Sequence, residues 1–301
     1  MDKVPIRCAA MSACTLEQVL FIRNRGFEQY YSDMTTSMEK LLRSFVNNSI
    51  SPEHSVIAFD ADEDKPIGFV FVAIKEVNGR LLAWNGGTGI IPEYRGRGLS
   101  KQLLGEVKRV IVKANVHRAW LEVVSANKPA IAAYQSIGFD IVDNLIGMTA
   151  KEDWNPHAWA ADEADGRQVL EMDPEQCSRL PFYREDAAWC GQWHVLKSRG
   201  GRGICIRNGS NEIAGYALYE MQTDRHGLVN SSTLYQLEVA PGERDKKATI
   251  QRLLLEVFSS ESPDCARTVA DLSCSEPLTL ELLTGGGFRE IYRQYLLALN
   301  L

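Results

Sequence analysis

Apolar residues recur every three to four positions after residue 98, and this spacing predicts an amphipathic helix. Its apolar face would consist of Leu99, Leu103, Leu104, Val107, Val110 and Ile111. Three apolar runs precede it, at residues 55–59, 66–77 and 81–91, and polar turn residues separate them. Runs of this length and composition predict β-strands.

Further elements flank this centre. We expect a short strand at 6–8, a helix at 15–25, and a second helix that begins with a capping box of Thr36 and Glu39 and reaches Val46. After the central helix come a strand at 119–124, a helix at 130–137 and a strand that starts at Phe139. This order predicts an α/β fold, with a mixed sheet flanked by helices.

The turn before the central helix is rich in glycine and arginine. It reads Tyr94-Arg95-Gly96-Arg97-Gly98-Leu99-Ser100. The first amides of a helix have no partner within the helix, and glycines leave room for a ligand to approach them. The helix dipole and two arginines add positive charge, so the turn is suited to a phosphate or a diphosphate.

Other glycine-rich turns fit less well. A P-loop requires Lys followed by Ser or Thr, where this chain has Leu99 and Ser100. A dinucleotide-binding turn requires a third glycine, where this chain has Lys101. An ordinary turn with two solvated arginines stays open on this segment alone.

Two motifs together resemble the GNAT acetyltransferases. The first is Arg/Gln-x-x-Gly-x-Gly/Ala, which Arg95 and Gly98 match, with Ser100 at the last position. The second is a strand followed in order by Asn127, Ala130, Tyr134 and Gly138-Phe139. The resemblance covers residues 1–150 and implies the fold of that family.

The resemblance also implies acetyl-CoA as a co-substrate, with transfer of its acetyl group to an amine. The pyrophosphate would lie on the backbone of Arg95, Gly96, Arg97, Gly98, Leu99 and Ser100. The pantetheine arm would pair with the backbone of Gly89, Ile90 and Ile91. The N–H of Ile91 or of its neighbour would donate to the thioester oxygen.

Tyr134 would contact the coenzyme and act as the general acid that protonates the leaving thiolate; a tyrosine packed against the sheet is the alternative. Asn127 would contact the pantetheine arm, serve as a helix N-cap, or both. The general base is open. Glu122 lies on a neighbouring strand, on a face that alternation alone does not decide. Glu28 and Asp33 would line the acceptor pocket or belong to a polar loop, and a water chain can replace a direct base.

The chain contains a second, weaker copy of the same pattern. Positions 66–71, 92, 102–107 and 138–139 correspond to 213–218, 241, 252–257 and 287–288, at an offset of 147–150. This repeat predicts two tandem GNAT folds, at 1–150 and 167–301, joined by a linker at 151–166. Each half offers one closing strand, which leaves an exchange of edge strands between the halves open.

The second copy lacks the glycine turn. Its corresponding segment is Gly242-Glu243-Arg244-Asp245-Lys246-Lys247-Ala248, and Glu276 and Leu283 replace Asn127 and Tyr134. Side chains would cover the helix amides, and carboxylates would repel a phosphate. We therefore expect the second half to keep the fold without the cofactor.

Composition narrows the class of protein. The 301 residues carry a formal net charge of −6 and are 45% apolar, which indicates a folded protein and argues against nucleic acid as a partner. We expect no membrane-spanning segment and no secretory signal. The seven cysteines are scattered and form no C-x-x-C pair, so we expect reduced thiols, no metal site and a cytoplasmic location.

The sequence therefore predicts an N-acetyltransferase that acts on a primary amine of a small-molecule acceptor, by direct transfer in a ternary complex. The alternative is a non-catalytic acyl-CoA-binding protein with a regulatory or interaction role. A third possibility is a relative of tandem enzymes such as mycothiol synthase or antibiotic-modifying transferases. The acceptor and the oligomeric state are left open.

Overall fold

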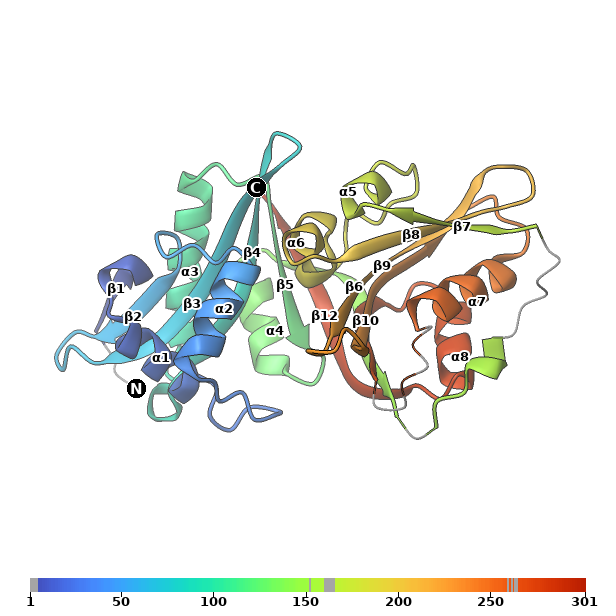
Figure 1. Ribbon diagram of the computed structural model, residues 1–301. Coiled ribbons are helices and arrows are strands. Elements are labelled where there is room, and N and C mark those ends of the chain that lie inside the picture. The colour runs from blue at the N-terminus through green and yellow to red at the C-terminus, as the bar shows by residue number, and fades with distance from the viewer. Residues whose placement is uncertain (1–4, 152, 160–165, 259, 261, 263–264) are drawn as a thin grey trace. The chain divides into compact units, whose positions relative to one another are not determined.

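The computed structural model describes residues 5–151, 153–159, 166–258, 260, 262 and 265–301 (Figure 1). The chain divides into two compact units. Unit 1 consists of Met1–Ile141 and Leu297–Leu301, and unit 2 of Val142–Leu296. No helix in the described part of the chain is long and apolar enough to cross a bilayer.

Unit 1 is built on a mixed sheet. Its strands are β1 (Ile6–Ala10), β2 (Val56–Asp60), β3 (Pro66–Val77), β4 (Arg80–Ile90) and β5 (Arg118–Val124). Its helices are α1 (Leu16–Gly26), α2 (Met38–Asn47), α3 (Leu99–Lys113) and α4 (Lys128–Gln135). The sheet order is β1-β2-β3-β4-β5, and the end of β12 (Arg289–Asn300) follows β5. β1 to β4 are antiparallel neighbours, whereas β4 and β5 are parallel. The predicted mixed α/β sheet is confirmed.

Local signals set the helix ends in unit 1. Thr15 forms a capping box with Gln18 at the start of α1. Ser37 caps α2 by accepting a hydrogen bond from the Lys40 N–H, one residue later than the expected cap at Thr36. The strand expected at 66–77 is β3, with the same ends.

Unit 2 contains the remaining elements. Its strands are β6 (Asp140–Ala150), β7 (Gln168–Met172), β8 (Arg202–Arg207), β9 (Ile213–Thr223), β10 (Val229–Val239) and β11 (Ala266–Ser273). Its helices are α5 (Pro174–Cys177), α6 (Trp193–Ser198), α7 (Lys246–Val257) and α8 (Pro277–Gly285). The sheet order is β12-β6-β11-β10-β9-β8-β7. β10 and β11 are parallel, as β4 and β5 are in unit 1.

The closing strands of the two repeats are exchanged. β6 follows the first repeat in sequence, yet it pairs antiparallel with β11 and buries Ile146, Met148 and Ala150 in the core of unit 2. The last residues of β12 belong to unit 1, where the Leu301 N–H donates to the His117 C=O at 3.1 Å. The units therefore differ from the expected boundaries at 1–150 and 167–301, because β6 joins the sheet of unit 2 and the end of β12 joins unit 1.

Two tryptophans of the expected linker pack against the core of unit 2. Trp159 lies in the short helix η3 (Pro156–Trp159), is fully buried, and donates its indole N–H to the Leu282 C=O at 2.6 Å. Its ring stacks on Phe288 with centroids 6.1 Å apart, and Trp154 packs against the same cluster. Positions 152 and 160–165 of that linker lie outside the described residues.

Candidate active site

The turn between β4 and α3 exposes backbone amides. Gly96 and Gly98 both have a φ of +74°, which favours glycine, and a Cβ added to either would meet no atom within 4 Å. Gly98 is the N-cap of α3 and provides no side chain to cap it. The first amides of α3 therefore project from the positive end of the helix dipole with open space above them. A phosphate fits such a site.

Arg95 ties this turn to the rest of unit 1. Its Nε donates to the Ile90 C=O at 2.8 Å, and its Nη2 donates to the carbonyls of Gly26 at 3.1 Å and Glu28 at 2.7 Å. We expected the charge of Arg95 to add to the phosphate site. Its guanidinium binds the carbonyl oxygens of Gly26 and Glu28 at the end of α1 and of Ile90 at the end of β4, so Arg95 positions the turn, and its contribution to the phosphate site stays a prediction.

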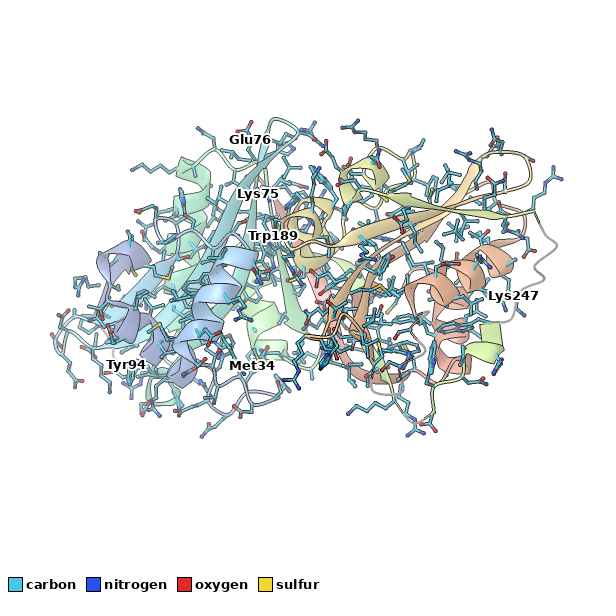
Figure 2. The ribbon with its side chains drawn as sticks, viewed as in Figure 1. Met34, Lys75, Glu76, Tyr94, Trp189 and Lys247 are labelled. Carbon is cyan, nitrogen blue, oxygen red and sulfur yellow. The ribbon has the colours of Figure 1, made fainter. Side chains whose placement is uncertain are left out.

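Tyr94 anchors the same turn through its hydroxyl (Figure 2). The hydroxyl donates to Asp60 Oδ2 at 2.7 Å, and this hydrogen bond raises the pKa of Tyr94 to about 12. The same bond lowers the pKa of the Asp60 carboxyl. Arg97 is exposed, and its guanidinium carbon lies 5.2 Å from the centre of the Tyr94 ring. Arg97 therefore keeps a positive charge at the mouth of the turn.

β4 and β5 separate beside this turn. Their parallel pairing ends at Trp84 and Trp120, although both strands continue beyond that point. β4 also carries a bulge at Gly86, where its register with β3 shifts by one residue. The two strands therefore enclose a gap, and the edge of β4 beyond Trp84 borders it.

The phase of the β3–β4 ladder decides which backbone groups face the gap. The Ile91 N–H donates to the Ile67 C=O at 3.0 Å, and Gly89 is paired with Phe69. Since backbone groups alternate in direction along a strand, the N–H of Ile90 points to the other side, toward the gap. Of the two amides considered for the thioester oxygen, the Ile91 N–H is already bonded within the sheet. Its neighbour Ile90 is the available donor.

Tyr134 lies on α4 beside this edge. It is 7% exposed, and its hydroxyl interacts with the side chains of Thr88 and Asn85, which come from the part of β4 that borders the gap. Burial raises the pKa of Tyr134 to about 12. The phenol is therefore protonated at neutral pH, as a proton donor must be.

Asn127 serves as the N-cap of α4, the role expected of an Asn at a helix start. Its side chain accepts a hydrogen bond from the Ala130 N–H at 3.3 Å. It also interacts with the hydroxyl of Tyr30, whose pKa is raised by burial and lowered by this hydrogen bond. Contact of Asn127 with the pantetheine arm stays a prediction.

The register of β4 and β5 decides the face on which Glu122 lies. Trp120 pairs with Trp84, and Glu122 is two residues further along β5, so all three lie on one face of the sheet. The Trp84 indole N–H donates to Glu122 Oε2 at 2.6 Å. Ala83 and Ala119 point to the opposite face, where α3 packs. Glu122 is therefore on the sheet face away from α3.

The two other acidic candidates have local partners. Glu28 forms an ion pair with Arg25 at 2.5 Å. Asp33 accepts a hydrogen bond from the Thr35 N–H at 2.9 Å, and hydrogen bonding lowers the pKa of this carboxyl. Of the three, Glu122 is the carboxylate next to the gap.

A cavity of about 190 Å³ opens on the Trp84 face of unit 1. Apolar walls come from Phe27, Leu41, Phe45, Ile50, Phe71 and Trp84. The polar part of the lining includes Arg23, Thr36, Lys40 and Ser44. Met34, which lies on the loop after α1 (Figure 2), also lines this cavity. Sequence reasoning missed Arg23 and Lys40, because they lie on two different helices and match no motif.

The corresponding turn in unit 2 is closed by its own side chains. Asp245 is the N-cap of α7 and accepts a hydrogen bond from the Ala248 N–H at 3.1 Å. Glu243, whose side chain is 6% exposed, accepts one from the Asp245 N–H at 2.9 Å. Lys247 lies in the first turn of α7 (Figure 2). Carboxylates thus occupy the amides that a phosphate would need.

Beside the gap between β4 and β5, the two faces of the sheet of unit 1 therefore carry different chemical groups. The glycine turn with its exposed amides and the Tyr134 phenol lie on the face of α3 and α4, and the Glu122 carboxylate and the cavity lie on the other face. In the described part of the chain, no group of three or more His, Cys, Asp or Glu side chains is placed to hold a metal ion.

Known proteins resemble this chain in sequence over its first half and in fold over nearly its whole length. Residues 18–139 match the model of the Acetyltransferase (GNAT) family. A GCN5-related N-acetyltransferase from Sphaerobacter thermophilus is 13% identical, with 98% of this chain and 95% of that chain covered and a TM-score of 0.63. A tandem GNAT protein from the clavulanic acid biosynthesis pathway is 15% identical, with 98% of each chain covered and a TM-score of 0.59.

A third solved structure matches only part of a larger protein. It is the glucosamine N-acetyltransferase region of a fungal multi-domain β-N-acetylglucosaminidase, 13% identical, with 99% of this chain and 38% of that chain covered and a TM-score of 0.66. No curated protein matches the chain. The family match supports N-acyl transfer as the class of activity. Residues 18–139 therefore match the GNAT acetyltransferase family, and nearly the whole chain shares the fold of a tandem GNAT protein.

Proposed function

We propose that unit 1 is an N-acetyltransferase, which transfers the acetyl group of acetyl-CoA directly to a primary amine in a ternary complex. The observation that carries the proposal is the uncapped glycine turn of α3 beside the gap between β4 and β5. Tyr134 borders that gap on one face and Glu122 on the other. Unit 2 would keep the fold without the coenzyme, because its own carboxylates occupy the corresponding amides.

The residues of unit 1 fit the coenzyme. The amides from Gly96 to Lys101 would hold its diphosphate, because the left-handed glycines leave the space above them open. Arg97 would add charge. The Ile90 N–H faces the gap and would pair with the pantetheine arm or the thioester oxygen. When bound, acetyl-CoA supplies an acetyl group activated as a thioester.

The two faces of the gap would divide the proton transfers. Glu122, held by the Trp84 indole, would accept the proton of the acceptor ammonium directly or through water. The amine nitrogen would then form a bond to the acetyl carbon and lose its second proton to water while the carbon–sulfur bond breaks, and the Ile90 N–H would stabilise the charge on the oxygen. Tyr134 would donate its proton to the departing thiolate and regain one from solvent.

Binding and turnover can be measured separately. Calorimetry should show one acetyl-CoA bound per chain, and a stoichiometry of none or two would contradict the proposal. Release of free thiol from acetyl-CoA with a panel of amines should report turnover. A non-catalytic acyl-CoA-binding protein would bind the coenzyme and release no thiol with any amine.

Tyr134→Phe tests the role of the phenol. Loss of a general acid should lower kcat about 100-fold, while the Kd for acetyl-CoA stays that of the wild type. Tyr31, which is exposed on the loop after α1, provides the matched control Tyr31→Phe, for which we expect no change. A large loss of coenzyme affinity in Tyr134→Phe would instead assign Tyr134 a structural role.

A further inference from the structure

The cavity on the Trp84 face narrows the choice of acceptor. We infer that it binds a hydrophobic amino acid, that is, a small amine with an apolar body and a carboxylate. The inference rests on the proposed N-acetyltransferase function and names its substrate class.

The position of the cavity is suitable for an acceptor. Trp84 and Gly86 form part of its wall, and both belong to the stretch of β4 where the pairing with β5 ends. The Trp84 indole also reaches Glu122, the carboxylate that we propose as the base. An amine held in the cavity beside Trp84 is therefore close to the gap and to that carboxylate.

The lining favours an apolar body of limited size. The Phe45 and Phe71 rings pack edge to face with centroids 4.9 Å apart, and Phe27 and Leu41 add further apolar surface. The volume of about 190 Å³ is more than ten times the roughly 10–15 Å³ that one water molecule needs. A hydrophobic side chain would fill this space and exclude water from it.

The charge of the cavity favours a carboxylate. Arg23 from α1 and Lys40 from α2 both line it, and none of its described lining residues is acidic. The Arg23 guanidinium is half-buried over the Phe27 ring, 5.2 Å from its centre. Burial lowers the pKa of Arg23, and the nearby charge of Asp33 raises it. Within the described residues, no carboxylate forms an ion pair with the Lys40 ammonium.

These two cations also argue against polyamines and aminoglycosides. The chain as a whole carries a formal charge of −6, which by itself would attract such polycations. The local charge at the cavity has the opposite sign, and local charges dominate because salt screens distant ones beyond about 10 Å. A carboxylate placed between a guanidinium and an ammonium would gain charge-assisted hydrogen bonds instead.

Matched ligands test the carboxylate directly. Leucine, methionine, phenylalanine and tryptophan are titrated into the full-length protein in the presence of CoA, and the best binder is compared with its amide and its decarboxylated amine. Loss of a hydrogen-bonded charge should weaken binding about tenfold or more. The inference is overturned if the amide binds as tightly as the acid, or if spermidine binds more tightly than any amino acid.

Variants on one helix locate the effect. Lys40→Gln should raise the Kd for the amino acid about tenfold and leave the Kd for the decarboxylated amine unchanged. Arg43→Gln is the matched control, because Arg43 is an exposed residue of α2 that pairs with Glu39 at 2.7 Å and does not line the cavity. Arg23→Gln should act as Lys40→Gln does, with circular dichroism to verify its fold. Equal effects of Lys40→Gln and Arg43→Gln would refute the inference.

Thiol release separates this inference from the proposed function. If amino acids bind with the expected preference but no amine releases thiol, the proposed function fails and the ligand class of the cavity stands. If amines release thiol without any preference for a carboxylate, the proposed function stands and the inference fails.

Discussion

Replacing Gly98 with aspartate should strongly weaken acetyl-CoA binding while the protein stays folded. Gly98 has a φ of +74°, and a Cβ there would meet no atom within 4 Å. An ordinary side chain in this conformation costs roughly 1–2 kcal/mol, and Asn and Asp tolerate it best. Gly98→Asn therefore measures the backbone cost, and Gly98→Asp adds a negative charge to the same side-chain shape.

That charge acts in opposite directions on stability and on binding. A carboxylate at the N-terminus of α3 should stabilise the free protein by about 0.3–1 kcal/mol through the helix dipole. At about 5 Å from a phosphate charge, with an effective dielectric constant of about 20–80, the same carboxylate opposes binding by about 1–3 kcal/mol. The Kd of Gly98→Asp should therefore exceed that of Gly98→Asn by roughly 5- to 150-fold for each phosphate charge.

Calorimetric titration with acetyl-CoA and thermal unfolding of the three proteins measure both effects. Gly79→Asp is the matched control, because Gly79 has a φ of +75°, also with open space around it, and lies in the β3–β4 turn. It should bind acetyl-CoA as the wild type does. The reasoning is refuted if Gly98→Asp binds as tightly as Gly98→Asn, or if their difference does not shrink as salt is added.

Three further predictions follow from other residues. The pKa of Tyr134 is about 12 in the folded protein, against an ordinary value of 10, so its protonated phenol contributes stability that is present below pH 10 and lost as the pH rises toward 12. Spectroscopic titration of the wild type and of Tyr134→Phe should show one phenol that ionises late, and a phenol that ionises at the ordinary pH would contradict the burial of Tyr134. Arg95→Met should lower the free energy of unfolding by about 1–3 kcal/mol, because three carbonyls lose their donor. Urea unfolding measures this loss, and weaker acetyl-CoA binding at unchanged stability would instead make Arg95 a direct ligand of the coenzyme. Asp245→Ala should lower the free energy of unfolding by about 0.5–2 kcal/mol, because α7 loses its N-cap, and should leave the Kd for acetyl-CoA unchanged. Altered coenzyme binding would instead indicate a second site in unit 2.

Features that depend on neighbouring residues could be predicted from the sequence. The glycine turn and α3 follow from residues 94–111 alone, because helix spacing and left-handed glycines are local properties. The contrast with Glu243 and Asp245 is equally local, and both carboxylates do bind amides at the start of α7. The fold class followed from the order of these segments.

Features that depend on distant partners could not be predicted. The sequence does not show that Arg95 binds the carbonyls of Gly26 and Glu28, almost 70 residues away. The face of Glu122 depends on a register that pairs Trp84 with Trp120. The alternation of Ile146 and Met148 suits a sheet in either half, so it does not reveal that β6 joins β11.

Comparison with unit 2 indicates that the fold determines the gap between the strands, whereas a few side chains determine whether the helix amides beside it are exposed. The pairing of β10 with β11 ends at Leu234 and Val269, although both strands continue, just as β4 and β5 separate in unit 1. In unit 2 the gap is bridged by protein: the Arg184 guanidinium donates to Glu238 on β10 and to Ser275 beyond β11. Because this repeat bridges its gap with an arginine and covers its helix amides with carboxylates, we expect it to keep the sheet without binding an anionic ligand there. The proposed division of labour between the repeats is therefore set by side-chain charge on a shared backbone, and a change at Gly98 alone should move unit 1 toward the state of unit 2.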